Sequence, residues 1–294
     1  MQRKIFIVAI LVTLTLTGCL MVSNSRQSLV EGRVIGTSGF PVPGVTVELD
    51  GKTVEPDRSG YFGVKGVSHG PQTLKVIVDG DVVATEDITV SGAVTVVDDI
   101  AVYDEDGFVE LTDWTTSGDD EVKGTWTVFD DDGFRMSQTD ADEGVTNAFI
   151  QWSQQGPRIV YEWSMTFESE LESDDAGGLH FLAADKRPSK GGGYNGDSYL
   201  VFQRATNINV FRYEAGNSTP HDDISFRDVP AAEGETHRYR VIMHTDTGVI
   251  EVYRNGEFIG DWVDDDPIQS GQFIAARTKN AAVTYSNIRI RIDE

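Results

Sequence analysis

Apolar and polar residues alternate with a period of two in many short segments of this chain. The clearest is residues 158–168, where Ile159, Tyr161, Trp163, Met165 and Phe167 alternate with residues that are mostly polar. A period of two turns one set of side chains toward a core and the other toward solvent, as in a half-buried β-strand. Amphipathic helical periodicity is hard to find anywhere, so we predict an all-β protein.

Turn signals divide residues 28–103 into short strands. Asp50-Gly51 and Asp79-Gly80 are typical of tight hairpin turns, and the Gly- and Pro-rich residues 39–44 interrupt the alternation. About seven short strands with frequent turns fit a small β-sandwich. We therefore expect the first domain over residues 28–103.

The composition shifts at Asp104-Glu105-Asp106-Gly107, which we take as a domain boundary. Residues 104–294 contain longer alternating segments, and Asn255-Gly256 is a strong type I′ hairpin signal. About a dozen antiparallel strands over this length fit a two-sheet jelly-roll β-sandwich. The expected architecture is therefore a seven-stranded sandwich followed by a larger one.

The first eighteen residues have the pattern of an export signal. Arg3 and Lys4 are followed by the mainly apolar residues 5–16, a run shorter than the roughly 20 residues that span a bilayer. The next residues, Leu16-Thr17-Gly18-Cys19, resemble the bacterial lipobox, which implies cleavage after residue 18 and a diacylglycerol on Cys19. Residues 19–27 would then be a lipidated tether. An ordinary signal peptide with an unmodified cysteine is the alternative.

The lipobox resemblance implies a lipid-anchored, extracytoplasmic protein of the bacterial cell envelope, in the outer membrane or at the cell surface. Cys19 is the only cysteine, so no internal disulfide can form. The mature chain would carry 22 basic and 48 acidic residues, a formal charge of −26. Such a surface repels the phosphate backbone, so we exclude nucleic acid as a partner.

Two family resemblances follow the domain division. The first domain resembles the carboxypeptidase regulatory-like, transthyretin-like sandwich in Gly32-Arg33-Val34, Pro43-Gly44-Val45-Thr46-Val47, Asp57-Arg58-Ser59-Gly60-Tyr61-Phe62 and Leu74-Lys75-Val76. That resemblance implies a non-catalytic spacer. The second domain resembles concanavalin A-like, laminin G-type sandwiches in His237-Arg238-Tyr239-Arg240-Val241, in residues 248–257 and in Ser286-Asn287-Ile288-Arg289-Ile290. That resemblance implies a carbohydrate-facing sheet.

A weaker resemblance, in residues 177–181, 193–194 and 199–201, is to the 3-keto-disaccharide hydrolase branch of the same superfamily. Sugars bind by stacking on aromatic rings and by hydrogen bonds to planar polar groups. Candidate glycan-binding residues are His180, Tyr194, Tyr199, Gln203, Arg204, Arg212, Trp126 and Trp152. Tyr199 and Gln203 share a strand face that Arg204 does not, so not all can serve. Core packing is the alternative for the tryptophans, and the one we prefer for Trp163.

No catalytic residues can be assigned. Glycoside hydrolysis usually needs two carboxylates flanking the bond, and the nearest set, Glu168, Glu170 and Glu172 before Asp174-Asp175, is better explained as a solvated charge run. The histidines lack zinc spacing, so we expect no metal site. The acidic turns at residues 130–132, 140–143 and 264–266 leave structural calcium open and no other cofactor expected.

Three functions remain open: a glycan-binding lipoprotein, a glycoside hydrolase or 3-keto-glycoside-cleaving enzyme, and a structural or adhesive envelope protein. The first is preferred, so enzymatic activity is uncertain and not the expectation. Its partners would be a glycan or polysaccharide and, through the lipid, a membrane.

Overall fold

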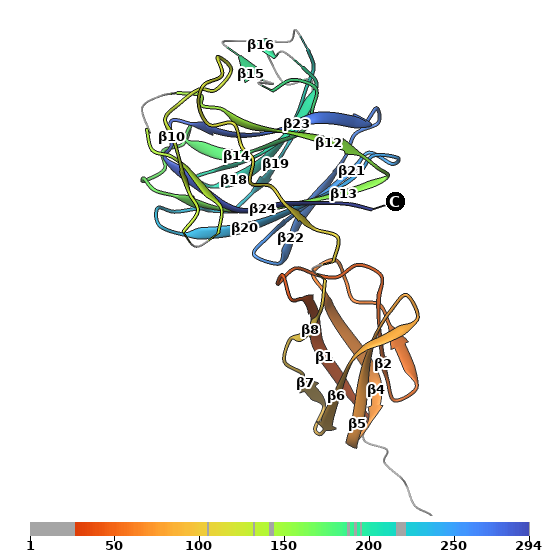
Figure 1. Cartoon of the computed structure of the whole chain (residues 1–294). Helices are drawn as coiled ribbons and strands as arrows, with labels where there is room; N and C mark the ends of the chain where they lie inside the picture. The colour runs from red at the N-terminus through yellow and green to blue at the C-terminus, as the bar shows by residue number, and fades with distance from the viewer. Residues whose placement is uncertain are drawn as a thin grey trace, which may run out of the picture. The chain divides into compact units, whose positions relative to one another are not determined.

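The all-β prediction is confirmed. A computed structural model of the 294-residue chain describes residues 27–104, 106–131, 133–140, 144–186, 189–190, 193–194, 196–215 and 222–293, and these residues form strands and connections without a helix (Figure 1). Accordingly, no membrane-crossing helix occurs in the described part of the chain. The signal residues 1–18, Cys19 and the tether up to residue 26 lie outside it.

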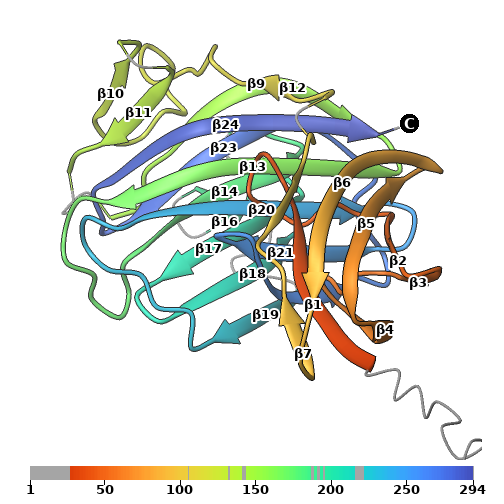
Figure 2. The same cartoon turned by 90° about the horizontal axis from the view of Figure 1, so that it is seen from below.

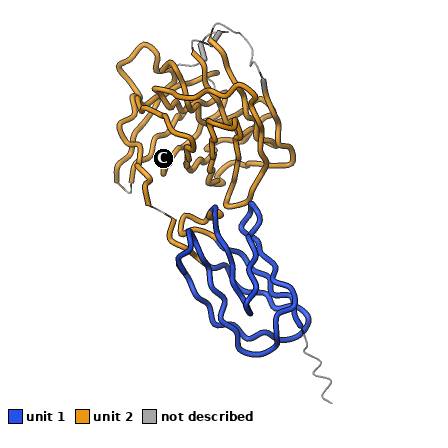
Figure 3. Tube along the Cα trace, turned by 90° about the vertical axis from the view of Figure 1, so that its right-hand side faces the viewer, with its two compact units in different colours: residues 1–34, 43–100 blue, residues 35–42, 101–294 orange. Residues whose placement is uncertain are grey.

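Contacts along the chain separate two compact units (Figure 3). The first unit comprises the residues up to 34 together with residues 43–100. The second unit comprises residues 101–294 together with residues 35–42, a loop that the chain traverses between β1 and β2.

The first unit is a small β-sandwich of two four-stranded sheets. One sheet has the order β4-β1-β7, with β8 also paired to β1, and the other has the order β3-β2-β5-β6. The strands are β1 (Gln27–Gly36), β2 (Val45–Leu49), β3 (Lys52–Val54), β4 (Tyr61–Ser68), β5 (Gly70–Val78), β6 (Asp81–Val90), β7 (Val94–Val96) and β8 (Ile100–Val102). Alternate residues of β2 and β5 are fully buried, as the sequence pattern predicts, and Val47 lies opposite Val76 in the core.

The second unit is a larger sandwich of an eight-stranded and a six-stranded sheet (Figure 2). The eight-stranded sheet has the order β10-β11-β24-β13-β20-β21-β22, with β9 paired to β24. Its strands are β9 (Val109–Glu110), β10 (Trp126–Phe129), β11 (Arg135–Gln138), β13 (Arg158–Phe167), β20 (Thr236–His244), β21 (Val249–Arg254), β22 (Glu257–Val263) and β24 (Val283–Asp293).

The six-stranded sheet has the order β12-β23-β14-β17-β18-β19. Its strands are β12 (Ala148–Gln155), β14 (Ala176–Ala183), β17 (Ser198–Arg204), β18 (Asn207–Tyr213), β19 (Asp222–Arg227) and β23 (Ser270–Lys279). A separate two-stranded hairpin pairs β15 (Ser189–Lys190) with β16 (Gly193–Tyr194). The described strands of the two large sheets all pair antiparallel, so the predicted two-sheet sandwich is confirmed.

The core between the two large sheets contains the apolar face of β13 that the alternation predicts. All five residues of that face, Ile159, Tyr161, Trp163, Met165 and Phe167, are at most 3% exposed and belong to the central hydrophobic cluster. The predicted Asn255-Gly256 hairpin joins β21 to β22, and both residues have positive φ, as a type I′ turn requires. Since each strand buries one face, the other face of each sheet points outward.

Tyr285 of β24 connects the two sheets through the core. Its hydroxyl accepts a hydrogen bond from the Gly178 amide at 2.9 Å and donates to the Arg277 carbonyl oxygen at 2.7 Å. The side chain of Tyr285 is fully buried, and burial is the main cause that raises its pKa far above the ordinary tyrosine value. This brace fixes β14 and β23 where their outer face carries the candidate site.

Candidate functional site

The outer face of the six-stranded sheet carries a row of side chains that runs across four neighbouring strands. Strand register places Arg277 of β23 opposite Gly178 of β14, Gly178 opposite Phe202 of β17, and Phe202 opposite Asn209 of β18. The adjacent residues on these strands, such as Leu179, Val201 and Val210, point into the core. Residues directly opposite in antiparallel strands share a face, so this row points outward.

Gly178 makes the row possible. A Cβ at this position would lie 1.9 Å from the carbonyl oxygen of Val201, so any side chain would collide with the backbone of β17. The empty position lets the Arg277 guanidinium lie over the Phe202 ring, with its carbon 5.4 Å from the ring centroid. An arginine, an aromatic ring and an asparagine amide therefore lie side by side.

Several polar atoms of this face are buried without a hydrogen-bond partner among the described residues. They are Nε and Nη1 of Arg277, Nε2 of His180 and Nε of Arg204. Arg277 is 8% exposed and His180 is fully buried. Buried polar groups in proteins are nearly always paired, and an unpaired charge is costly. These four unpaired nitrogen atoms on one face indicate a place where a ligand supplies the missing hydrogen-bond partners.

His180 lies next to the row and contacts Ser198 of β17 and Tyr213 of β18. Its Nδ1 lies 3.1 Å from the Ser198 hydroxyl, and its ring contacts Tyr213 at a centroid distance of 5.6 Å. Burial, and secondarily the nearby charge of Arg277, hold the pKa of His180 well below its usual range. The imidazole is therefore neutral at pH 7, and Nε2 is either a hydrogen-bond donor or an acceptor depending on the tautomer.

The outer face divides into an apolar part and a polar part. Next to His180, the apolar side chains of Leu200, Phe211 and Tyr213 are at most 9% exposed and form their own cluster with Ala176 and Phe202. On the other side of the row, Asn207 donates to Asn209 Oδ1 at 2.6 Å and to Ser225 Oγ at 3.0 Å. Only the polar part has a lining that suits hydroxyl-rich ligands.

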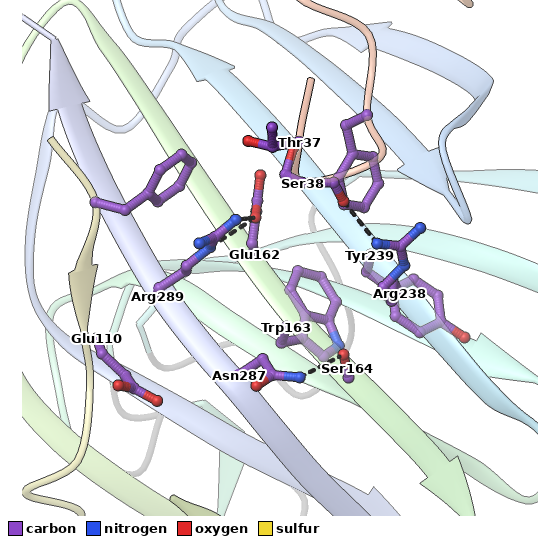
Figure 4. A pocket seen from close by; sticks show the side chains of 12 residues that line it. Thr37, Ser38, Glu110, Glu162, Trp163, Ser164, Arg238, Tyr239, Asn287 and Arg289 are labelled. Atoms are coloured by element: carbon purple, nitrogen blue, oxygen red, sulfur yellow. Dashed lines mark hydrogen bonds and ion pairs between the residues drawn. The ribbon is translucent and has the colours of Figure 1, made fainter. Parts of the chain in front are cut away.

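A concavity of about 450 Å³ lies on the outer face of the opposite, eight-stranded sheet and is lined by residues of the second unit alone (Figure 4). Glu162 lies at its floor, where its carboxylate accepts hydrogen bonds from Arg240 Nε at 2.5 Å and Arg289 Nε at 2.8 Å. Arg238 donates to the Ser38 carbonyl oxygen at 2.6 Å. The Glu162 carboxylate and the Arg238 guanidinium thus have hydrogen-bond partners within the protein.

Arg240 ties the 35–42 loop and Asp104 to the eight-stranded sheet. Besides Glu162, its guanidinium donates to the Pro41 carbonyl oxygen at 3.0 Å, to Ser38 Oγ at 2.9 Å and to Asp104 Oδ2 at 3.0 Å. Burial opposes ionisation of Asp104, but hydrogen bonds from Ser38 and from Arg240 outweigh it, so the pKa of this carboxyl is lowered. We interpret this network as structural.

Three candidate residues from the sequence lie on the core side of the six-stranded sheet. Tyr199 and Arg212 both bond Asp264, at 2.5 Å from the phenol and 2.8 Å from Nη1. Gln203 accepts from the Tyr239 hydroxyl at 3.1 Å and donates to the Val229 carbonyl oxygen at 2.9 Å. All three are at most 9% exposed and already have partners, so their described role is to bridge internal polar groups.

The other candidates have different environments. Arg204 and His180 point to the outer face, and Arg204 lies opposite Ala176 at the polar end. Trp126 and Trp152 are partly buried and pack against the central core, as the core-packing alternative requires, and Trp163 is in that core. The backbone of Tyr194 is in β16, but its side chain lies outside the described residues. Of the eight candidates, His180 and Arg204 are the two whose described side chains lie on the outer face of the six-stranded sheet.

Arg277, Phe202 and Asn209 were not among the sequence candidates. The segment that contains Phe202 reads Ser-Tyr-Leu-Val-Phe-Gln-Arg and is apolar on both faces. Period-two alternation cannot identify the outward face of such a strand. Arg277 gives a local signal, since it is a charged residue directly after the apolar stretch Phe273-Ile274-Ala275-Ala276.

The described residues offer little for catalysis or metal binding. On the outer face of the six-stranded sheet, Asp223 is the only carboxylate among the described strand side chains, so the two-carboxylate arrangement lacks its pair. Glu168, Glu170 and Glu172 are exposed in the connection from β13 to β14. No described group of three or more His, Cys, Asp or Glu side chains is arranged to hold a metal ion.

No protein-family model matches the sequence, and no curated protein matches it. Among solved structures, a carbohydrate-binding module, CBM66 from Bacillus subtilis, is similar at 19% identity and a TM-score of 0.45, over 61% of this chain and 96% of that one. A Bacillus subtilis protein of unknown function with a galectin-like fold is similar at 15% identity and a TM-score of 0.46, over 63% and 97%. The Emp47p carbohydrate recognition domain is similar at 11% identity and a TM-score of 0.42, over 65% and 97%.

Proposed function

We propose that this chain is a membrane-anchored lipoprotein of the bacterial cell envelope whose larger sandwich binds carbohydrate. The binding surface is the polar part of the outer face of the six-stranded sheet. The observation that carries this proposal is the row of Arg277, Phe202 and Asn209 across Gly178. It places two planar polar groups, the kind of side chain that hydrogen-bonds sugars, beside the Phe202 ring, which is 3% exposed. The concanavalin A-like sequence resemblance supports the same reading.

A glycan array tests the binding function with the full mature chain in detergent. We expect binding to at least one glycan and loss of that binding in Asn209→Ala, which removes an amide from the row. Asn287→Gly is the matched control, because Asn287 is an asparagine on the outer face of the opposite sheet and glycine tolerates its positive φ. A blank array, or equal binding by both variants, would contradict the proposal.

Membrane anchoring rests on the lipobox-like Leu16-Thr17-Gly18-Cys19 and is tested separately. Cys19→Ala should remove the site of lipid attachment, so the protein should no longer incorporate labelled fatty acid and should leave the membrane fraction. Cys19→Ala protein that still sediments with membranes would refute lipid anchoring. With the lipid on Cys19, the first unit serves as a spacer between the lipid and the binding sandwich.

A further inference from the structure

We propose that the outer face of the six-stranded sheet binds a glycan through an anionic group, a carboxylate or sulfate on a sugar, which pairs with Arg277. This inference rests on the proposed carbohydrate-binding function and adds the chemical class of the ligand. The geometry that supports it is the burial of Arg277 without a hydrogen-bond acceptor.

Arg277 differs from an ordinary surface arginine in both burial and partners. It is 8% exposed, and two of its three guanidinium nitrogens are buried without an acceptor among the described residues. Its guanidinium lies over the Phe202 ring. A ring face attracts a cation but accepts no in-plane N–H hydrogen bonds, so those donors stay unused.

The groups around Arg277 increase the need for an anion. Lys279 is two residues after Arg277 in β23, so the two side chains lie on the same face of the sheet. Ala176 of β14 lies opposite both Lys279 and Arg204, so these two cations belong to the row next to that of Arg277. Among the described residues, the carboxylate that pairs with these two cations is Asp174, at 3.9 Å from each, and its side chain is 71% exposed. Such a long, exposed pair neutralises little charge. Three cations therefore gather on one face of a strongly acidic chain.

A neutral sugar would satisfy this face poorly. Hydroxyl groups can accept hydrogen bonds from Arg277, but they bring no charge into a partly dry site. A carboxylate or sulfate supplies both the acceptors and the counter-charge, and charge-assisted bonds to arginine are among the strongest that proteins make. The formal charge of −24 on the chain repels densely charged polymers. The preferred ligand is therefore a glycan with isolated acidic sugars.

The test compares matched charged and neutral probes on the full mature chain in detergent. Trigalacturonate is compared with its methyl ester, which keeps the sugars and removes the carboxylate charge, and 3′-sulfolactose is compared with lactose. The same array that tests the proposed function is scored for carboxylated and sulfated glycans against neutral partners. We expect at least one charged probe to bind about 10- to 100-fold more tightly than its neutral partner, and increased salt to weaken it.

Variants of Arg277 then assign the preference to this residue. Arg277→Gln should abolish the preference for the charged probe, whereas Arg277→Lys should keep part of it. Arg238→Gln, an exposed arginine on the opposite sheet, is the control and should bind like the wild type. Because the Arg277 charge is unpaired, Arg277→Gln should not lower the melting temperature, which separates lost binding from lost folding.

The possible outcomes distinguish the two proposals. Equal binding of charged and neutral probes, or a charge preference that survives Arg277→Gln, overturns the inference and leaves carbohydrate binding intact. A blank array overturns carbohydrate binding and this inference with it. Preference for trigalacturonate over its ester identifies a carboxylate, and preference for 3′-sulfolactose over lactose identifies a sulfate.

Discussion

Each outer face of the larger sandwich carries a buried arginine, but the two arginines differ in their hydrogen-bond acceptors. On the eight-stranded sheet, Arg240 is 3% exposed and donates to Glu162, Ser38, Pro41 and Asp104. On the six-stranded sheet, Arg277 is 8% exposed and has no acceptor among the described residues. Arg240 and Arg277 are thus similarly buried, but only Arg240 has hydrogen-bond acceptors for its guanidinium.

Whether a buried arginine has acceptors distinguishes a charge that stabilises the fold from a charge that is available to a ligand. A buried guanidinium that has its acceptors forms all its hydrogen bonds within the folded protein, so their energy contributes to folding. A buried guanidinium without acceptors costs folding energy that only a bound partner can recover. A concavity of about 450 Å³ lies on the face where Arg240 is paired, so the presence of a cavity alone would favour the wrong face.

The largest expected effect separates these two arginines. Arg240→Met leaves Glu162 and Asp104 buried with fewer partners, and removing one member of a buried pair typically costs about 3–5 kcal/mol. We expect a loss of that size in the free energy of unfolding, measured by urea denaturation. Arg277→Met should cause little or no loss. Equal destabilisation by the two substitutions would show that Arg277 is structurally paired after all.

A smaller effect is expected at the brace that supports the candidate site. Tyr285→Phe removes a buried hydroxyl and leaves the Gly178 amide and the Arg277 carbonyl without their partner. An unsatisfied buried group costs about 1–3 kcal/mol. The unfolding free energy should fall by that amount, and glycan affinity should fall with it because Arg277 loses its backbone anchor. Unchanged stability would mean that the hydroxyl contributes nothing to holding β14 and β23.

The smallest predicted effect is a pH dependence from His180. Its pKa is lowered in the folded protein, so the unfolded chain binds a proton below about pH 6.5 that the folded chain does not. Stability contributed by the neutral imidazole is therefore present above that pH and lost as pH falls, by at most about 1.4 kcal/mol per pH unit.

His180→Asn should flatten the fall of stability between pH 7 and 5, measured as melting temperature against pH. His237 also has a lowered pKa, caused first by burial, and contributes in the same direction in both proteins. The difference between wild type and variant isolates His180. Parallel curves for the two proteins would contradict its burial in the neutral form.

Much of the fold could be predicted from local sequence. The alternation in β13 identified its buried face, and the Asp-Gly and Asn-Gly pairs identified hairpins, because both signals depend on a few consecutive residues. The same local reasoning correctly separated Tyr199 and Gln203 from Arg204. Local sequence could not show which of these two strand faces points into the core.

The candidate site could not be predicted because its row depends on long-range pairing. Arg277 lies opposite Gly178, almost a hundred positions earlier in the chain, and Phe202 is in a strand that is apolar on both faces. Register between distant strands is set by the whole packed sheet and not by any local pattern. The candidates chosen from the sequence therefore included only His180 and Arg204 among the outward residues of the site.

Titration calorimetry on two matched arginine variants tests most directly which face binds carbohydrate. Arg204 and Arg238 are both partly accessible arginines, one on each outer face. With a glycan that the wild type binds, Arg204→Gln should weaken affinity about tenfold, the loss of roughly one hydrogen bond, while Arg238→Gln should leave it unchanged. Weakened binding in Arg238→Gln with wild-type affinity in Arg204→Gln would place the ligand on the opposite sheet and contradict this account.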